Sequence, residues 1–164
     1  MAKYIIIKDK IKIFKKKIKV SSDKSISIRC VLMASQAAGI SKISNLLESE
    51  DVLNTLKTIK KLGINYYKKG NTYYIEGFGL NGFNIKKKII INAGNSGTLA
   101  RLIFGLLINS KNQIILKGDK SLSKRDFSRV INPMRMFGEN IKSKNQRLPI
   151  KIKGTDYPRP INYD

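Results

Sequence analysis

The chain has 164 residues, 41% of them hydrophobic, which is enough for one domain or a pair of small ones with a buried core. It holds 33 Lys and Arg against 11 Asp and Glu, a formal net charge of +22. Such a charge first suggests a polyanion such as nucleic acid. The lysines are spread along the whole chain, however, and Ile and Asn are equally over-used, as an AT-rich coding sequence would produce. We therefore discount nucleic acid as a partner, and small anionic metabolites are fully compatible with this charge.

Composition excludes several kinds of site. The chain has no histidine, and its carboxylates are scattered without ligand-like spacing, which excludes zinc sites and Ser-His-Asp triads. The single cysteine, Cys30, cannot form a disulfide within the chain, so we expect a buried structural thiol in a reducing compartment. The N-terminal MAKYIIIKDKIKIF has too short an apolar run for a signal peptide or a membrane span. We therefore expect a cytoplasmic protein that does not contact membranes.

The first half of the chain is predicted to alternate short strands with helices. Ser21-Ser22-Asp23, which are typical N-cap residues, precede the first helix, whose apolar positions include Ile26 and Met33. Acidic residues open the second helix, and Gly63 ends it. The expected elements are strands at Tyr4–Ile7, Ile11–Phe14 and Ile18–Val20, a helix from Asp23 to Ala38, a strand at Ser41–Leu47, a helix from Ser49 to Leu62, and a hairpin of Ile64–Lys68 with Thr72–Glu76.

The second half repeats this order of elements. Gly63 and Gly138 lie 75 residues apart, and each is followed by a strand, a polar turn and a second strand. The expected elements are a strand at Ile89–Ala93, a helix from Asn95 to Asn109, a strand at Gln113–Leu116, a helix at Phe127–Phe137 and two further strands. We therefore predict an α/β (α+β) chain with two βαβαββ units, at about 20–78 and 89–154, joined by the glycine-rich connector Gly77–Lys88.

A candidate anion site lies where the predicted strand Ile89–Ala93 meets the following helix. The sequence IIINAGNSGTLARLIFGLL places Gly94 and Gly97 among residues that cap helices. A helix that begins near Asn95 would offer unpaired N–H groups to an anion at the positive end of its dipole. The simpler alternative is a strand-turn-helix joint whose glycines serve only the backbone geometry.

Two more polar stretches place basic residues at helix starts. The start of the first helix is surrounded by Lys24, Ser25 and Arg29. Because the helix dipole disfavours cations there, the two basic residues indicate a site for an anion. Arg125 ends the stretch GDKSLSKR just before the helix at Phe127–Phe137. In both places the alternative is a cap or loop with solvated charges. The repeat puts the helix starts at Lys24 and Asn95 in equivalent positions, so both could converge on one ligand.

Three motifs together resemble a known enzyme family. They are DKSISIR at Asp23–Arg29, NAGNSGTLARL at Asn92–Leu102, and GDKSLSKR followed by RLPIKIKG. Their order and spacing resemble 5-enolpyruvylshikimate-3-phosphate synthases over nearly the whole chain. The resemblance implies transfer of an enolpyruvyl group from phosphoenolpyruvate to shikimate 3-phosphate, giving 5-enolpyruvylshikimate 3-phosphate and phosphate, in aromatic amino-acid biosynthesis. It also implies a monomeric two-domain enzyme, with the substrates between the domains and with no metal or cofactor.

The resemblance also assigns roles to individual residues. Carried over by position, Lys24, Ser25 and Arg29 would bind shikimate 3-phosphate. Lys24 would also bind phosphoenolpyruvate, together with Asn95, Gly97 and Arg125. No catalytic residue is expected in this chain, because the resemblance places the general acid/base carboxylates in the part of the family's sequence that this chain lacks.

The sequence departs from the family pattern in three ways. Ser21-Ser22 stands where Pro-Gly is usual, and Asp126-Phe127 follows Arg125 where Pro-Met is typical. The Asp126 carboxylate is expected either to pair with Arg125 and weaken phosphoenolpyruvate binding, or to turn away into a backbone hydrogen bond. The chain is also much shorter than the family's, so we expect an incomplete synthase. Residues 20–164 would form the substrate-binding domain without its third unit, and residues 1–19 would be strands of the missing second domain.

Three other functions stay open on the sequence alone. An enolpyruvyl transferase acting on UDP-N-acetylglucosamine would need a reactive loop cysteine, whereas Cys30 lies within a predicted helix. A nucleic-acid-binding module would need a stacking platform, which the pairs Tyr66-Tyr67 and Tyr73-Tyr74 do not obviously form. The third alternative is a non-catalytic metabolite-binding or structural domain.

Overall fold

The protein was analysed as a computed structural model, which describes residues 5, 6, 8, 13, 15, 17, 18, 20–85 and 88–163. The strands expected at Tyr4–Ile7 and Ile11–Phe14 lie mostly outside these residues. Where the N-terminal stretch is described it forms no strand, and Ile18 and Val20 are 72% and 77% exposed. The prediction of a strand at Ile18–Val20 is therefore wrong at these two positions, because neither is paired with another strand there.

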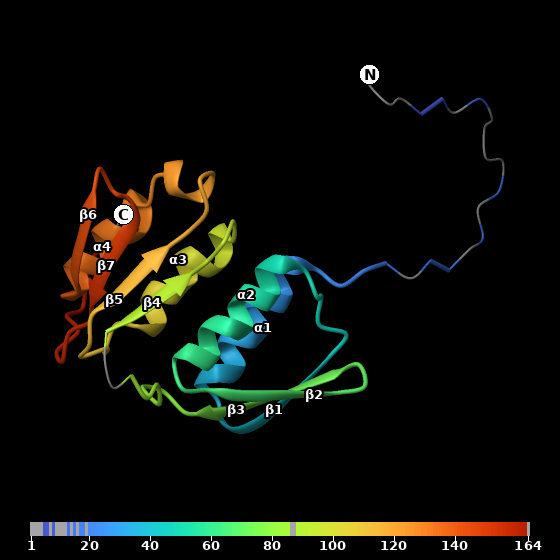
Figure 1. Cartoon of the computed structure of the whole chain (residues 1–164), viewed down its shortest axis with the longest axis horizontal. Helices are drawn as coiled ribbons and strands as arrows, with labels where there is room; N and C mark the ends of the chain where they lie inside the picture. The colour runs from blue at the N-terminus through green and yellow to red at the C-terminus, as the bar shows by residue number, and fades with distance from the viewer. Residues whose placement is uncertain are drawn as a thin grey trace.

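The first unit is a three-stranded antiparallel sheet covered on one face by two helices (Figure 1). Its sheet order is β1-β3-β2. The elements are α1 (Lys24–Gln36), β1 (Ala38–Ser44), α2 (Glu50–Lys61), β2 (Asn65–Lys69) and β3 (Thr72–Phe78). The hairpin of β2 and β3 confirms its prediction, since it turns at Gly70 in the left-handed region, with φ +58°. Strand β1 begins and ends three residues earlier than predicted.

The second unit is a four-stranded mixed sheet with the order β4-β5-β7-β6. Strands β4 and β5 are parallel, whereas β7 is antiparallel to both of its neighbours. The elements are β4 (Ile89–Asn92), α3 (Gly97–Leu106), β5 (Ile114–Lys117), the 3-10 turn η1 (Leu122–Lys124), α4 (Ser128–Phe137), β6 (Asn140–Lys144) and β7 (Arg147–Lys153). Helix α4 ends at Gly138, whose φ of +109° suits glycine.

The two units share one order of strands. The order β1-β3-β2 of the first sheet corresponds to β5-β7-β6 of the second, and α1 and α2 correspond to α3 and α4. The difference is β4, which pairs with β5 at the sheet edge. Strand β1 lies at the corresponding edge, where the described residues supply no fourth strand. Within the described residues, the first unit therefore shows αβαββ where βαβαββ was predicted.

The two units meet through their helices and share one core. Helix α1 contacts α3, α2 contacts β4, and the Lys61 ammonium donates to the carbonyl of Ile90 at 2.9 Å. The buried side of α1 carries Ile28, Val31 and Leu32. Two apolar residues predicted for this helix, Ile26 and Met33, lie instead on its outer side and are 60% and 73% exposed. Cys30 is only half-buried, so the expectation of a buried thiol was wrong.

Candidate functional site

The start of α3 is held in place by short polar side chains. After β4 the Asn92 carboxamide accepts from the Gly94 N–H at 3.0 Å, and Gly94 adopts a φ of +58°. The Ser96 hydroxyl then accepts from the N–H of Leu99 at 3.3 Å. Because this cap belongs to Ser96, the helix begins at Gly97 and not at Asn95 as predicted. Asn95 is left in the turn with its side chain free to contact Arg125.

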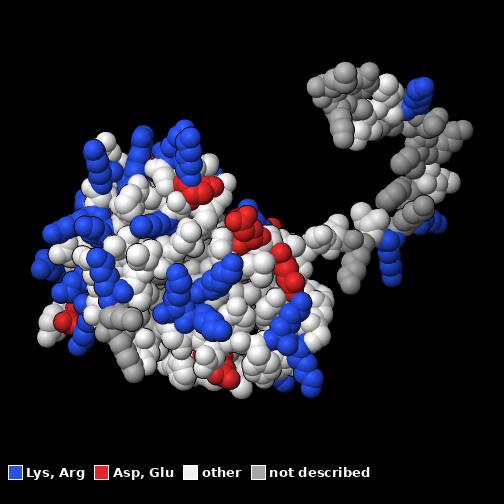
Figure 2. Space-filling view, in the orientation of Figure 1, with Lys and Arg blue, Asp and Glu red and all other residues white. Residues whose placement is uncertain are grey.

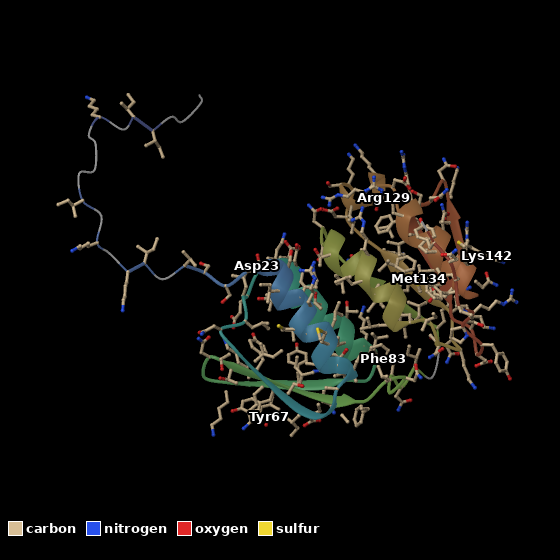
Figure 3. The ribbon with its side chains drawn as sticks, turned by 180° about the vertical axis from the view of Figure 1, so that it is seen from behind. Asp23, Tyr67, Phe83, Arg129, Met134 and Lys142 are labelled. Atoms are coloured by element: carbon tan, nitrogen blue, oxygen red, sulfur yellow. The ribbon has the colours of Figure 1, made fainter. Side chains whose placement is uncertain are left out.

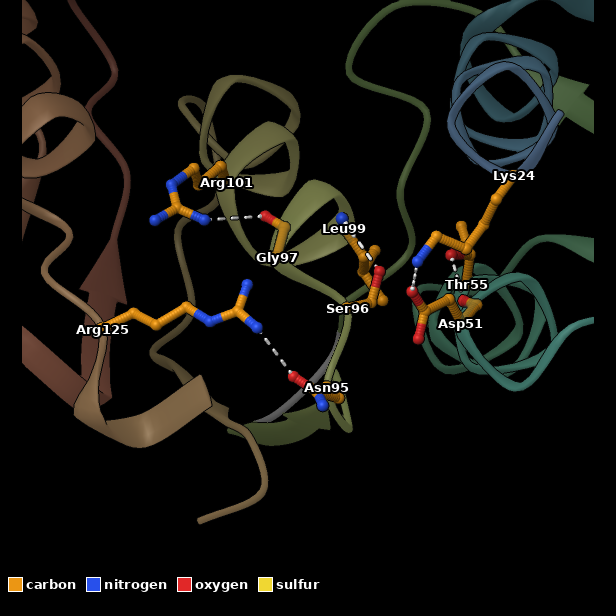
Figure 4. Close-up of polar contacts among 9 residues, drawn as sticks. All are labelled: Lys24, Asp51, Thr55, Asn95, Ser96, Gly97, Leu99, Arg101 and Arg125. Atoms are coloured by element: carbon orange, nitrogen blue, oxygen red, sulfur yellow. Dashed lines mark hydrogen bonds and ion pairs between the residues drawn. The ribbon is translucent and has the colours of Figure 1, made fainter. Parts of the chain in front are cut away.

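A pocket of about 340 Å³ opens beside this helix start (Figure 4). It collects side chains from both units, with α1 and α2 on one side and α3 and the segment after η1 on the other. The lining residues are Lys24, Asp51, Asn95, Gly97, Thr98, Arg101 and Arg125. Three cations and one carboxylate leave two positive charges, and the first N–H groups of α3 add the positive end of a helix dipole. This arrangement suits a small ligand with two negative charges.

Gly97 lets two guanidinium groups approach the helix start. A Cβ atom at this position would lie 2.9 Å from Nη1 of Arg101 and 3.0 Å from Nη1 of Arg125. Arg125 also donates to the Asn95 side-chain oxygen at 3.1 Å. Figure 4 shows both arginines reaching toward Gly97 and Asn95 from the same side. The glycine therefore has a role beyond backbone geometry, because any side chain would occupy the space that the arginines use.

Arg101 joins α3 to the segment that carries Arg125. Its guanidinium donates to the carbonyl of Gly97 at 3.5 Å and to the carbonyl of Asp126 at 3.3 Å. It also stacks over the ring of Phe127, with 5.0 Å from the guanidinium carbon to the ring centroid. Phe127 is fully buried, so this contact is anchored to the core. Arg101 thereby ties the start of α3 to the segment after η1 on one side of the pocket.

The Asp126 carboxylate turns away from Arg125. It accepts from the hydroxyl of Ser128 at 2.7 Å and from the N–H of Ser128 at 2.8 Å. The hydrogen bond from the Ser128 hydroxyl, followed by the backbone hydrogen bond, lowers the pKa of Asp126. Of the two expectations for this residue, the backbone hydrogen bond is confirmed. Arg125 is left with its contact to Asn95.

Lys24 is paired with a carboxylate that the sequence did not indicate. Its ammonium lies 2.8 Å from a carboxylate oxygen of Asp51, in the first turn of α2. The Asp51 side chain is 16% exposed and that of Lys24 is 52% exposed. In the sequence, Asp51 was explained as one of the acidic residues that open the second helix, where the dipole favours them. Only the packing of α2 against α1 brings it to the pocket.

The structure separates the predicted residues into two groups. Lys24, Asn95, Gly97 and Arg125 line the pocket together, whereas Ser25 and Arg29 do not line it. Ser25 is half-buried beside Lys24. Arg29 is exposed, one turn further along α1, and borders a different groove, between α1 and α3.

The remaining basic side chains are distributed over the surface. Figure 2 shows Lys and Arg in separate groups on the visible face of both units, with white and red areas between them and no single stripe. Among the residues that the structure describes, no helix is long and apolar enough to cross a membrane, and no three His, Cys, Asp or Glu side chains cluster as metal ligands would.

Fold and pocket together define an α/β protein with a positively charged pocket at the starts of α1 and α3. A sequence model of the family EPSP synthase (3-phosphoshikimate 1-carboxyvinyltransferase) matches residues 8–164. The chain therefore belongs to the EPSP synthase family.

Individual relatives and a solved structure agree with this family. The chain is 46% identical over 148 residues to the 3-phosphoshikimate 1-carboxyvinyltransferase of Vesicomyosocius okutanii, and 47% identical over 148 residues to that of Ruthia magnifica. Each match covers 90% of this chain and 34% of the relative. The structure of EPSP synthase from Acinetobacter baumannii matches with a TM-score of 0.82 and 32% identity, over 92% of this chain and 34% of that one. The chain thus spans about a third of its relatives' length.

Proposed function

We propose that these residues form one wall of the substrate site of an EPSP synthase, which transfers the enolpyruvyl group of phosphoenolpyruvate to shikimate 3-phosphate. The observation that carries the proposal is the pocket at Gly97, where Lys24, Arg101 and Arg125 surround the start of α3. Phosphoenolpyruvate carries a phosphate and a carboxylate on a small frame, and guanidinium groups bind both in a fixed geometry. The family membership supplies the chemistry that this geometry serves.

Shikimate 3-phosphate is assigned to the start of α1. Lys24 is the first residue of this helix, and Ser25 and Arg29 continue from it along α1. The two ligand groups share Lys24, so the substrates would meet beside that residue. The Asp51 carboxylate supports this arrangement, because it holds the Lys24 ammonium at the edge of the pocket.

We also propose a place for this chain in the complete enzyme. The two units that begin near residues 20 and 89 would form most of one domain, and the part of the family's sequence that these 164 residues do not match would supply a third unit and the opposite domain. Residues 1–19 would belong to that opposite domain. General acid/base groups would then come from outside this chain, so the 164 residues alone should show no enolpyruvyl transfer.

The aromatic pairs of the hairpin give little support to nucleic-acid binding. The rings of Tyr67 and Tyr74 stack on each other, with centroids 4.8 Å apart, and Lys42 lies over Tyr74 at 5.9 Å. The faces that these two rings turn toward each other are therefore not available to successive bases, whereas Tyr67 as a whole stays 48% exposed.

The experiment uses a hybrid enzyme, in which residues 1–164 replace the segment that they match in the Vesicomyosocius okutanii relative. Arg29→Ala should weaken shikimate 3-phosphate binding by about 2–3 kcal/mol, the scale of a charge-assisted hydrogen bond. Arg125→Ala should raise the KM for phosphoenolpyruvate instead. The control Lys42→Ala, on the outer face of β1, should change neither constant. Equal effects of all three substitutions would refute the site assignment.

A further inference from the structure

The segment between η1 and α4 carries Arg125 to the pocket. Arg125 follows the 3-10 turn, and its backbone is extended, with φ −75° and ψ 147°. In Figure 3 the labelled Arg129 marks the first turn of α4, which comes next, and Met134 lies further along that helix. The Arg125 side chain is exposed and reaches Asn95 from this segment. Its position therefore depends on how the backbone at residues 125–127 is held.

Asp126 ties this segment to both neighbouring helices. Its carboxylate accepts from the hydroxyl of Ser128 at 2.7 Å and from the N–H of Ser128 at 2.8 Å, in the first turn of α4. Its backbone carbonyl accepts from the guanidinium of Arg101, on α3, at 3.3 Å. The next residue, Phe127, is fully buried, and its N–H donates to the carbonyl of Gln146 at 3.0 Å. The backbone at Asp126 is thus joined to α3, to α4 and to the core, next to the pocket.

The carboxylate of Asp126 restrains the backbone that leaves Arg125. A side-chain oxygen that accepts from the N–H two residues further on closes an Asx turn, and the second oxygen adds the Ser128 hydroxyl. A charged acceptor makes both hydrogen bonds stronger than neutral ones. Pro is typical of the family at this position, where its ring would fix φ. In this chain the two hydrogen bonds of Asp126 supply the restraint instead.

We propose that Asp126 is a positioning residue for phosphoenolpyruvate, and that it acts by holding Arg125 at the start of α3. This inference rests on the proposed function, because it needs Arg125 to bind that substrate. A carboxylate this close to the pocket would by its charge alone repel an anionic substrate. A role through position and a role through charge therefore predict changes of opposite sign in the KM when the carboxylate is removed.

Steady-state kinetics of the hybrid enzyme test this proposal. Asp126→Ala should raise the KM for phosphoenolpyruvate about fivefold with little change in kcat, because the Asx turn that holds Arg125 is lost. Asp126→Asn should bring the KM back to within about twofold of the unmodified hybrid, because a carboxamide oxygen still accepts from the N–H of Ser128. The control Thr155→Val removes a hydrogen bond of the same spacing, from the N–H of Tyr157 at 3.2 Å, and should change neither constant. A KM lowered by both substitutions at Asp126 would overturn the proposal, because the carboxylate would then act through its charge.

Arg125→Ala separates a failure of this proposal from a failure of the proposed function. In the Arg125→Ala background, Asp126→Ala should raise the KM by less than about twofold, because the group that it positions is gone. A full effect in that background would contradict the route through Arg125, as would an Asp126→Ala hybrid with a lower Tm and an unchanged KM, which would make the role of Asp126 purely structural. If Arg125→Ala alone left the KM unchanged, the assignment of phosphoenolpyruvate to Arg125 would itself be refuted.

Discussion

The site depends on the absence of a side chain at Gly97. In the hybrid enzyme, Gly97→Ala would place a methyl group 2.9–3.0 Å from the nearest guanidinium nitrogens. Both groups are the far ends of flexible side chains and move aside at small cost, so the free energy of unfolding should change by less than about 0.5 kcal/mol. The KM for phosphoenolpyruvate should rise about tenfold, or about 1.4 kcal/mol, because the arginines lose their positions. An unchanged KM would mean that neither arginine binds this substrate.

Asp51 is expected to position Lys24 and not to bind substrate itself. Asp51→Asn keeps the shape of the side chain but removes the charge that holds the ammonium at 2.8 Å. The pocket becomes more positive, so the KM for phosphoenolpyruvate should not rise, whereas kcat should fall about tenfold because Lys24 is less well oriented. Steady-state kinetics of the hybrid separate the two constants. A raised KM with an unchanged kcat would assign Asp51 to substrate binding.

At the scale of single residues, the sequence predicted residues that lie within its motifs and missed contacts that only the tertiary fold creates. Lys24, Asn95, Gly97 and Arg125 were predicted, and they lie around one pocket. Asp51 was missed because its approach to Lys24 depends on how α2 packs against α1. Arg101 lies within a predicted motif, but its contacts with Asp126 and Phe127 arise only from the tertiary fold.

Among the elements, α3 is expected to depend on its N-cap. Ser96 is fully buried, and its hydroxyl accepts from the N–H of Leu99. Ser96→Ala should therefore lower the free energy of unfolding of the 164-residue chain by about 1 kcal/mol. Urea denaturation measures the change. Ser49→Ala is a matched control at the N-cap of α2, where the hydroxyl is buried but makes no cap hydrogen bond, and it should cost much less. Equal losses would show that the Ser96 hydrogen bond contributes nothing.

Most elements were predictable because their signals are local. The hairpin of β2 and β3 turns at Gly70, and α4 ends at Gly138, as the residue types required. The prediction of a strand at Ile18–Val20 failed because an apolar pattern indicates only a tendency toward extended structure, and a strand also needs a neighbouring strand to pair with. The prediction that Ile26 and Met33 are core positions failed for a related reason, since no described residues cover the groove between α1 and α3.

For the molecule as a whole, one buried carboxyl should make stability depend on pH. Burial raises the pKa of Glu139 to about 8, and both of its oxygens lack hydrogen-bond partners. The folded chain therefore keeps a proton that the unfolded chain loses above its ordinary pKa of 4.5. The contribution of Glu139 to the free energy of unfolding should be fully present below that pKa. It should be lost as the pH rises toward about 8, by on the order of 1 kcal/mol per pH unit.

Glu139→Gln should remove this part of the pH dependence, and urea denaturation between pH 5 and pH 8 measures it. Glu48→Gln is a control at a carboxyl whose pKa is shifted in the opposite direction. A hydrogen bond from Lys68 lowers the pKa of Glu48, so its charged form stabilises the fold. That variant should be less stable than the unmodified chain across the same range. A Glu139→Gln variant with the slope of the unmodified chain would show that Glu139 is not desolvated.

We propose that this chain contributes to binding the anionic substrates of an EPSP synthase at the starts of α1 and α3. The most direct measurement is an NMR titration of the 15N-labelled chain with shikimate 3-phosphate at 150 mM salt, with a DNA duplex in a parallel titration. We expect shikimate 3-phosphate to shift the amide signals of Lys24, Ser25, Asn95 and Gly97, and DNA to give only weak, dispersed shifts that vanish as salt is raised. Shifts spread over the lysine-rich surface with both ligands, and none at the helix starts, would contradict it.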